Sequence, residues 1–384
     1  MNEPSKSVRH HCVMVDGTAL HPRMKGVGRY AWQLCDALER EMPAGGRLMI
    51  AVFDGILPAF REGFRGEFIR LPYSSELALG LRVFPRLLVD AGADAFIRPA
   101  DKIGTRYGVP TLTVCHDVNP MIWAVQPARP MKRRLLDDCW EFLRGRALRC
   151  SERVVCNSEF IRDAATRQFH LDPGKTEVGY CGVDPRIPAL ASDAAAGAMR
   201  QRIDEQGFLL AFATGDEREG YDILPQLWAA ARNCGYPGSL VVAGLKDELP
   251  YAARLKQAFQ AHGVAQCVQF MPFLGEAELP TLAGLYAAAD FYLETSRHEG
   301  FGMQLVEAMA CATTCFSSGR GALQEVGGGY PLALDITNPH AAGMAVTAAW
   351  QRGEHRRDHT AQVSHATRFD WSEARKAVVD FAWG

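Results

Sequence analysis

The feature that most restricts the fold of this chain is a repeated alternation of two kinds of segment. Along its 384 residues, short apolar runs rich in β-branched residues alternate with longer stretches whose apolar positions have helical spacing. Such alternation is typical of βαβ units, in which parallel strands are connected by helices that cover the faces of one sheet. The sequence therefore predicts an α/β protein with mostly parallel sheets.

The alternation occurs in two series, which predicts two domains, as the length of the chain also does. A helix is predicted at 27–42, and Asn157–Ser158 has the composition of a helix cap. Residues 182–207 are rich in Pro and Ala and indicate a connection between the domains, with a short helix inside it as one option. Strands are predicted at 12–17, 47–55, 109–117 and 151–156 before that connection, and at 208–215, 238–245, 268–275, 291–296 and 313–318 after it. Two doubly wound, Rossmann-like domains account for this order, and their ligands are expected at the carboxyl ends of the strands.

Composition excludes several classes of protein. The formal net charge of -2 gives no electrostatic reason to expect a nucleic-acid partner. Eleven Cys residues include no pair or Cys/His cluster with zinc spacing, and we expect Cys311 and Cys315 to be buried, reduced thiols. No apolar run is long enough to cross a bilayer, and the polar N-terminus lacks the apolar core of a signal peptide. We therefore expect a cytoplasmic protein.

The segment "SRHEGFGMQLVEAMA", residues 296–310, carries the strongest functional signal. Gly300 and Gly302 allow a tight turn in which amides at the start of the next helix point outward, an arrangement that suits a phosphate. Glu299 in the turn could accept hydrogen bonds from hydroxyl groups. Glu307 is a carboxylate on an otherwise apolar helix, which is costly unless donors such as ribose hydroxyls pair with it. The alternative is an exposed Glu299 and a Glu307 that is satisfied by a backbone cap or an Arg.

"EGFGMQLVEAMA" resembles the Glu-x7-Glu signature of glycosyltransferase family 4, whose members have the GT-B fold of two Rossmann-like domains facing across a cleft. Four more segments resemble the family in order, at 26–30 ("GVGRY"), 115–120 ("CHDVNP"), 154–160 ("VVCNSEF") and 369–382 ("FDWSEARKAVVDFA"). The resemblance implies an acceptor-side domain at 1–183, a linker at 184–206, a nucleotide-sugar-binding domain at 207–366, and a C-terminal helix at 367–384 that crosses back to the first domain.

The resemblance also implies an activity. Family members move a sugar, here a hexose, from a nucleotide-diphosphate sugar to a hydroxyl acceptor with retention of configuration and without a bound metal or other cofactor. The acceptor would be a glycan, a lipid-linked glycan or a small molecule. The absence of any Asp-x-Asp motif agrees with this chemistry, in which helix amides and basic side chains must stabilise the leaving diphosphate.

Individual roles follow from the same resemblance. Glu299 would contact the hydroxyls of the donor sugar, Glu307 would bind the nucleotide ribose, and His116 would contact the sugar near its reacting side. The acceptor side would include Arg29 and Asn157. The remaining donor-binding positions would be Gly28, Arg218, Gly300, Phe301, Gly302 and Met303.

One segment departs from the family pattern. Where the family has an Arg and a Lys that neutralise the diphosphate, residues 213–222 read "ATGDEREGYD", so Arg218 fits one basic position and Glu219 stands at the other. A desolvated carboxylate at contact would repel the diphosphate by about 4 kcal/mol at an effective dielectric constant near 20. Three interpretations stay open: Glu219 points away while Arg218 acts, with Arg297 or Arg320 assisting; the donor chemistry differs; or the protein is a catalytically silent GT-B protein that binds a sugar nucleotide.

The segment "GVGRYA" also matches the glycine pattern of dinucleotide-binding proteins. That pattern should follow its strand directly, but nine residues, Gly17 to Lys25, separate the two. An NAD-dependent oxidoreductase is therefore disfavoured. A loop beside the acceptor, with Arg29 meeting an anionic acceptor, is preferred over a helix start with Arg29 on the surface.

Residues 129–150, "RPMKRRLLDDCWEFLRGRALRC", form a basic stretch with an apolar stripe. The stripe comprises Leu136, Cys139 or Trp140, Leu143 and Ala147. Packing on the protein's own sheet is the preferred interpretation. Peripheral contact with the inner face of an anionic membrane is the alternative.

Overall fold

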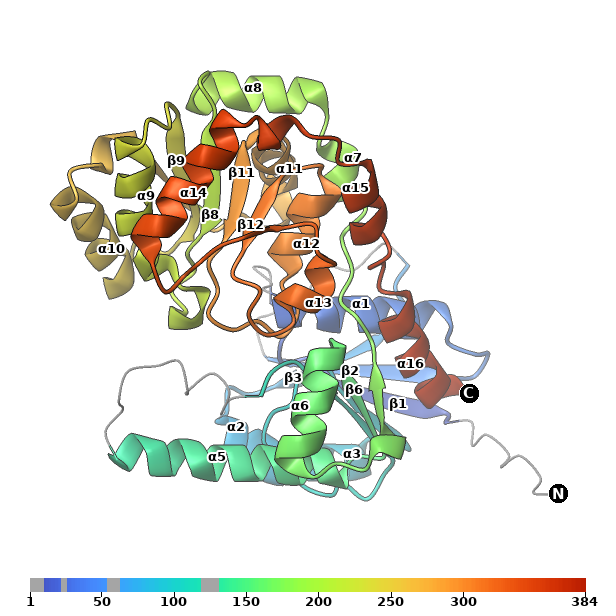
Figure 1. Cartoon of the computed structure of the whole chain (residues 1–384). Helices are drawn as coiled ribbons and strands as arrows, with labels where there is room; N and C mark the ends of the chain where they lie inside the picture. Colours follow the sequence, from blue (N-terminus) through green and yellow to red (C-terminus); the bar gives the residue numbers. More distant parts are fainter. Residues whose placement is uncertain (1–9, 22–25, 54–62, 119–130) are drawn as a thin grey trace. The chain divides into compact units, whose positions relative to one another are not determined.

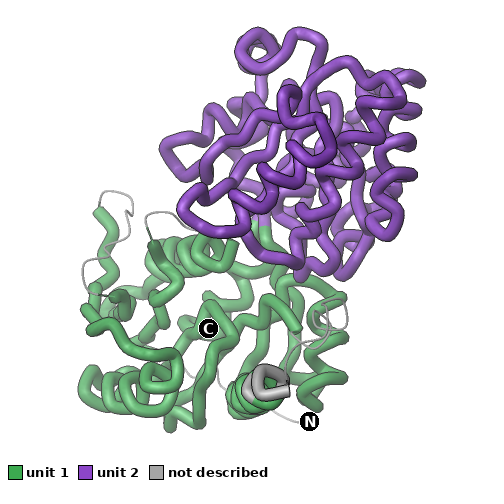
Figure 2. Tube along the Cα trace, turned by 90° about the vertical axis from the view of Figure 1, so that its left-hand side faces the viewer, with its two compact units in different colours: residues 1–181, 371–384 green, residues 182–370 purple. Residues whose placement is uncertain are grey.

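The structure is a computed structural model, and it describes residues 10–21, 26–53, 63–118 and 131–384. The chain divides into two compact units (Figure 2). Unit 1 comprises residues 1–181 together with 371–384, and unit 2 comprises residues 182–370.

Unit 1 is built on a parallel sheet of seven strands within the described residues, in the order β3-β2-β1-β4-β5-β6-β7. The three middle strands β1, β4 and β5 are buried along their whole length, as is typical of a parallel sheet covered on both faces. The strands are β1 (Cys12–Asp16), β2 (Arg47–Phe53), β3 (Glu67–Leu71), β4 (Ala95–Arg98), β5 (Thr111–Cys115), β6 (Arg153–Cys156) and β7 (Thr176–Val178).

The helices of unit 1 include one from the end of the chain. They are α1 (Gly26–Arg40), α2 (Glu76–Ala78), a π-helical turn (Leu79–Val83), α3 (Phe84–Asp90), α5 (Met131–Cys150), α6 (Glu159–Phe169) and α16 (Ser372–Trp383). Of the predicted cap Asn157–Ser158, Ser158 caps α6, because its hydroxyl accepts a hydrogen bond from the amide of Ile161 at 3.1 Å.

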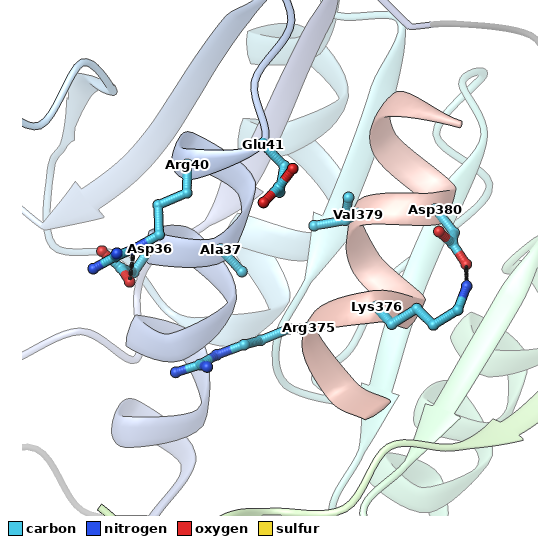
Figure 3. Close-up of a pocket in the computed structure, with 8 residues that line it drawn as sticks. All are labelled: Asp36, Ala37, Arg40, Glu41, Arg375, Lys376, Val379 and Asp380. Carbon is cyan, nitrogen blue, oxygen red and sulfur yellow. Dashed lines mark hydrogen bonds and ion pairs between the residues drawn. The ribbon is translucent and has the colours of Figure 1, made fainter. Parts of the chain in front are cut away.

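Helix α16 is attached to α1 by specific contacts. The indole of Trp383 donates to the carbonyl of Leu38 at 3.0 Å, and the ring of Trp371 packs edge-on against Tyr30. A groove of about 470 Å³ remains between the two helices (Figure 3). Its charged side chains compensate one another in the pairs Asp36–Arg40 and Lys376–Asp380, so the groove has no excess of either charge from these four residues.

Unit 2 contains a parallel sheet of six strands among the described residues, in the order β10-β9-β8-β11-β12-β13. Helices α9 and α14 pack on each other, as do α8 and α11 (Figure 1). The strands are β8 (Phe208–Phe212), β9 (Ser239–Leu245), β10 (Val268–Pro272), β11 (Phe291–Glu294), β12 (Cys315–Ser317) and β13 (Leu332–Ala333). The α-helices are α7 (Arg186–Leu190), α8 (Asp193–Ile203), α9 (Leu224–Asn233), α10 (Pro250–Ala261), α11 (Leu279–Ala288), α12 (Met303–Ala310), α13 (Leu323–Gly327), α14 (Pro339–Gln351) and α15 (Thr360–Ala366).

The segment 184–206 differs from the linker expected at this place. It forms α7 and α8, and both helices pack on α11 inside unit 2. Ile187 and Met199 are buried there, and Ser192 caps α8 by accepting from the amide of Ala195 at 3.2 Å. Burial of these two apolar side chains, one from each helix, makes the segment part of the domain.

Candidate active site

The turn that joins β11 to α12 has a backbone that requires glycine. Gly302 has φ +93°, and a Cβ atom added to it would lie 2.5 Å from Cδ2 of Leu323. Directly after it, α12 begins, and the amides of Leu305 and Val306 donate to the carbonyl of Gly302 at 3.1 and 3.3 Å. The start of α12 therefore offers backbone donors and the positive end of a helix dipole to an anion.

Neighbouring segments fix the backbone of Glu299. The amide of Ala322 donates to the carbonyl of Glu299 at 2.9 Å, and Gly321 lies so close that an added Cβ would be 2.3 Å from the same oxygen. The hydroxyl of Ser296 donates to Oε1 of Glu299 at 3.2 Å. The buried ring of Phe301 packs edge-to-face on Phe369, with ring centroids 5.4 Å apart. The turn is thus held in one shape by contacts on both of its sides.

A second acid lies beneath this turn. Glu294, the last residue of β11, is buried and accepts hydrogen bonds from the hydroxyl of Tyr292 at 2.8 Å and from the amide of Ser296 at 3.2 Å. Burial raises the pKa of Glu294, although the hydrogen bonds from Ser296 and Tyr292 oppose the shift. Sequence reasoning missed this residue, because it counted residues 291–296 as an apolar strand.

The raised pKa of Glu294 predicts a change in the pH dependence of stability. A carboxyl group whose pKa is higher in the folded than in the unfolded protein loses stabilising free energy as pH rises from about 4.3 through the folded value. Glu294→Gln cannot ionise, so its unfolding free energy, relative to that of the wild type, should increase between pH 4 and pH 8. Urea unfolding across this range measures the difference. Glu205→Gln, at an exposed position, is the control, and parallel pH profiles for Glu294→Gln and the wild type would contradict the assignment.

Glu307 has a partner that the sequence analysis did not name. It is buried in α12, and the hydroxyl of Tyr286 in α11 donates to its Oε2 at 3.1 Å. The expected alternatives for a satisfied Glu307 were a backbone cap or an Arg, and the structure shows a phenol instead. The signal in the sequence was a Tyr within the apolar helix 279–288, because a buried phenol usually has a hydrogen-bond partner.

The loop after β8 shows where the unexpected Glu219 points. Its Oε2 accepts from the amide of Thr214 at 2.6 Å, and its Oε1 accepts from the hydroxyl of the same residue. The carbonyl of Glu219 accepts from the hydroxyl of Thr295 at 2.6 Å. The carboxylate of Glu219 therefore points at Thr214, two residues after the end of β8, and accepts hydrogen bonds from both the amide and the hydroxyl of that residue.

The basic side chains of this region are already engaged with acids. Arg218 donates to Oδ2 of Asp216 through Nε and Nη2 at 2.9 and 2.7 Å. Arg297 donates to both oxygens of Asp222 at 2.6 and 2.7 Å, and this contact raises the pKa of Arg297. Arg320 is exposed in the segment after β12, and it interacts electrostatically with Asp335.

His116 directly follows β5 in unit 1. Its Nε2 lies 2.6 Å from the carbonyl oxygen of Pro99, and because a carbonyl only accepts, Nε2 must carry the proton. The ring lies edge-on to Tyr30, with centroids 4.9 Å apart. Burial lowers the pKa of His116, although Asp101 and Asp117 oppose the shift. The imidazole is thus neutral near pH 7, and its Nδ1 is an acceptor for a hydroxyl group.

Asn157 lies beside His116 in unit 1. Its side-chain amide donates to the carbonyl of His116 at 3.2 Å. Its Oδ1 is buried and has no hydrogen-bond partner among the residues that the structure describes. A buried amide oxygen in this position is suited to accept a hydrogen bond from a ligand.

The preferred interpretation of "GVGRY" as a loop is wrong. Residues 26–30 form the first turn of α1, where Gly28 is buried and Arg29 is half-buried. Tyr30 is buried in this turn, and its hydroxyl donates to the carbonyl of Gly179 at 2.8 Å. Gly28, Arg29, His116 and Asn157 thus belong to unit 1, and Arg218, Gly300, Phe301, Gly302, Met303, Glu299 and Glu307 belong to unit 2.

Within the basic segment 129–150, residues 131–150 form α5, residues 129 and 130 lie outside the described residues, and part of the expected stripe faces inward. Ala147 is buried, and Trp140 and Leu143 are half-buried, whereas Cys139 is exposed. The side chain of Leu136 lies outside the described residues. Leu135 and Phe142, seven positions apart, are exposed by 64% and 63%. In the parts of the chain that the structure covers, no helix combines the length and the apolarity needed to cross a membrane.

Two family models match the chain, one in each half. The model for Glycosyltransferase Family 4 matches residues 24–187, and the model for glycosyl transferases group 1 matches residues 198–360. The chain is 25% identical over 283 residues to a GDP-mannose-dependent alpha-(1-6)-phosphatidylinositol dimannoside mannosyltransferase of Mycobacterium tuberculosis, which covers 74% of this chain and 70% of the relative. It is 24% identical over 242 residues to O-antigen chain mannosyltransferase B of Escherichia coli, covering 59% of each.

Solved structures show the same fold. Sucrose-phosphate synthase from Thermosynechococcus elongatus superposes with a TM-score of 0.73 at 18% identity, covering 96% of both chains. WaaG, a glycosyltransferase involved in lipopolysaccharide biosynthesis, superposes with a TM-score of 0.74 at 16% identity, covering 97% of this chain and 100% of WaaG. The predicted GT-B fold class is confirmed. The chain therefore belongs to the glycosyl transferases group 1 of glycosyltransferase family 4, and it is a retaining hexosyltransferase that uses a nucleotide sugar.

Proposed function

We propose that unit 2 binds the nucleotide-diphosphate hexose through the turn at 299–303, and that unit 1 supplies His116 and the acceptor side. The observation that carries this proposal is the glycine-dependent turn: Gly302 has a positive φ and no room for a Cβ beside Leu323, and the segment Gly321–Ala322 fixes the backbone of Glu299. In this arrangement the amides of Gly300 to Met303 hold the sugar and the phosphates. Glu299 accepts hydrogen bonds from the hydroxyls of the sugar.

The buried acid Glu307 binds the ribose in this proposal. The hydroxyl of Tyr286 donates to Oε2 of Glu307, and this bond fixes the orientation of the whole carboxylate on α12. Two ribose hydroxyls are suitable donors for a buried carboxylate, and they would offset its desolvation when the nucleotide binds.

The orientation of Glu219 favours the first of the three interpretations of the loop after β8. Because both carboxylate oxygens accept from Thr214, the charge is held at that residue. Arg218 is the basic residue of this loop, and its contact with Asp216 is half-exposed, so it can exchange that partner for a phosphate at small cost. Stabilisation of the leaving diphosphate is then shared between Arg218 and the amides of α12.

The neutral state of His116 supports a role in contacting the donor sugar. A lowered pKa makes the imidazole a weak base, while its Nδ1 still accepts from a sugar hydroxyl. The oxygen of the leaving phosphate is then the group that takes the proton of the acceptor hydroxyl.

Donor binding and turnover test the proposal together. HepE of Anabaena has been solved with UDP and glucose, and the mycobacterial relative is named for GDP-mannose. UDP, GDP and ADP, followed by their glucose and mannose conjugates, form the panel. A nucleoside diphosphate at 100 times its dissociation constant should stabilise the protein by about 2.7 kcal/mol, which thermal unfolding detects. Hydrolysis or transfer of the matching sugar supports the enzyme.

Binding of a nucleotide sugar without hydrolysis or transfer, over a panel of sugar and lipid acceptors, is the result expected of a catalytically silent protein, and it would contradict the proposed reaction.

We further propose that α5 contacts an anionic membrane, where a lipid-linked acceptor resides. Leu135 and Phe142 are exposed on one face of this helix, and Arg146 and Arg149 are exposed on the same face one and two turns further on. Apolar side chains flanked by cations complement the negative charge of acidic lipids. The mycobacterial relative, by its name, acts on a phosphatidylinositol dimannoside.

The membrane contact predicts a specific loss in co-sedimentation with vesicles. The wild-type protein should bind vesicles that contain 30% phosphatidylserine and be released by high salt. The double variant Leu135→Ser/Phe142→Ser should bind at least about 100-fold less, because about 1.5 to 3 kcal/mol is lost for each large apolar side chain that no longer inserts. Val89→Ser, at an apolar position of α3 that is 77% exposed, is the matched control. Equal binding of the double variant and the wild type would contradict the proposal.

A further inference from the structure

One buried arginine of α5 contacts the two loops on which His116 depends. Arg144 is only 9% exposed, and its Nε donates to the carbonyl of Asp101 at 3.0 Å. Its Nη2 donates to Oδ2 of Asp101 and, at 2.9 Å, to the carbonyl of Asp117. Its Nη1 donates to Oε2 of Glu141 at 2.8 Å. The guanidinium therefore joins two backbone carbonyls and two carboxylates from three segments of unit 1.

Both loops are connected to the imidazole of His116, because one loop contacts the ring and the other contains His116. The loop after β4 contains Pro99, whose carbonyl accepts from Nε2 of His116, and two residues later Asp101, which Arg144 holds. The loop after β5 contains His116 itself, followed by Asp117, whose carbonyl Arg144 also holds. The relative position of the two loops thus decides whether the Nε2 hydrogen bond forms, and this bond determines which ring nitrogen remains an acceptor.

We propose that Arg144 is a positioning residue for sugar transfer, which clamps the loops after β4 and β5 and thereby orients the imidazole of His116. This inference rests on the proposed function, in which His116 contacts the donor sugar. Sequence analysis counted Arg144 only as one charge of a basic helix, because its partners at 101 and 117 lie far away in the chain.

The arrangement requires a guanidinium rather than a positive charge alone. Four acceptors surround Arg144 in different directions, and a planar fork of five donors can reach them together, whereas an ammonium group is a single point. A buried ion pair adds little net stability by itself, since desolvation offsets the attraction. The two carbonyl contacts satisfy further donors of the buried guanidinium, and they connect the loop after β4 with the loop after β5.

The charge of Arg144 also affects the pKa of His116, so removal of the guanidinium has an effect that can be measured at the imidazole. Burial is the main cause of the lowered pKa of His116, Asp101 and Asp117 raise it, and Arg144 contributes to lowering it. Burial alone would raise the pKa of Asp101, but Arg144 and His116 hold it below its ordinary value. Tyr30 on α1 completes the surroundings of the ring. Removal of the guanidinium should therefore move the pKa of His116 upward.

The test compares Arg144→Met and Arg144→Lys with Arg167→Met, at an exposed position of α6 in the same unit. The ¹⁵N resonances of His116, assigned with His116→Ala, report its tautomer and its titration in the full chain. In Arg144→Met, we expect the Nε2–H form to lose its dominance, the titration to move upward, and kcat to fall about 100-fold with a small change in the KM of the donor. In Arg144→Lys, the charge remains, so we expect the titration to stay near that of the wild type and kcat to fall about tenfold.

The two readouts separate this inference from the proposed function. Unchanged His116 resonances in Arg144→Met would overturn the clamp, and if that variant does not fold, unchanged tautomer and kcat in Arg144→Lys would overturn it. Altered resonances, together with normal transfer by His116→Ala, would leave the clamp in place and refute the role of His116 in transfer. Unaltered resonances in the Arg144 variants, with loss of transfer in His116→Ala, would overturn the clamp and support the role of His116 in transfer.

Discussion

Replacement of Glu299 by glutamine is expected to lower the transfer rate about 10²- to 10⁴-fold while the protein stays folded. The carboxylate would accept two hydrogen bonds from sugar hydroxyls, and bonds to a charged acceptor contribute about 1.5–3 kcal/mol each. Their loss in the transition state corresponds to that range of rates. The turn should keep its shape, because the contact between Ala322 and residue 299 is made by the main chain.

Ligand binding shows whether the effect has the proposed cause. Glu299→Gln should bind the free nucleoside diphosphate as the wild type does and should bind the nucleotide sugar more weakly, since Glu299 contacts only the sugar. Thermal unfolding with each ligand measures both affinities, and Glu205→Gln serves as a variant with the same chemical change at an exposed position. Wild-type turnover by Glu299→Gln would refute the assignment of this site.

Replacement of Gly302 by alanine is expected to abolish nucleotide binding. The left-handed backbone at φ +93° costs a non-glycine residue about 1–2 kcal/mol, and the added methyl group would overlap Cδ2 of Leu323 at 2.5 Å. Either the buried Leu323 side chain or the start of α12 must then move, and a displacement of the helix start of about 1 Å costs about 100-fold in rate. We expect the thermal stabilisation by the nucleoside diphosphate to disappear and transfer to fall at least by that factor.

Two further variants separate the overlap from the backbone strain. Gly353→Ala has a similar positive φ of +74° with no atom within 4 Å of an added Cβ, so it should lose stability but keep nucleotide binding. The double variant Gly302→Ala/Leu323→Ala removes the overlap and should recover part of the binding. Full nucleotide binding by Gly302→Ala alone would mean that the amides of this turn do not hold the phosphates.

The strands with continuous apolar sequences could be predicted, because a run of consecutive apolar residues is itself the signal of a strand that is buried on both faces. Strands β3, β4, β7 and β13 were missed, since β7 and β13 have only three and two residues and β3 has a partly exposed, charged sequence. Strand β4 ends in the buried Arg98, whose Nη2 donates to the carbonyls of Lys102 and Ile103. Because an Arg is usually exposed, the sequence does not reveal that this one is buried at the end of a strand and satisfied by backbone carbonyls.

In the candidate site, too, features made by residues that are adjacent in the chain could be predicted, whereas contacts between residues far apart in the chain could not. The turn 299–303 was predicted because its glycines and acids are adjacent in the chain. Tyr286, the partner of Glu307, lies 21 positions away, and Asp101, the partner of Arg144, lies 43 positions away. At "GVGRY" the two predictions disagreed: the helical spacing of 27–42 correctly indicated a helix, which the structure has at Gly26–Arg40, whereas the preferred loop interpretation is wrong.

The attachment of α16 to unit 1 determines how the protein can be divided into separately produced pieces. A fragment that ends at residue 181 would lack Trp371 and Trp383, and it would expose to water the faces of Tyr30 and α1 that these rings cover. Residues 182–370, in contrast, form one uninterrupted piece whose two ends meet, because the amide of Val183 donates to the carbonyl of Phe369 at 2.8 Å. Unit 2 is therefore the half suited to recombinant expression alone, and nucleotide recognition can be studied on it without the rest of the chain.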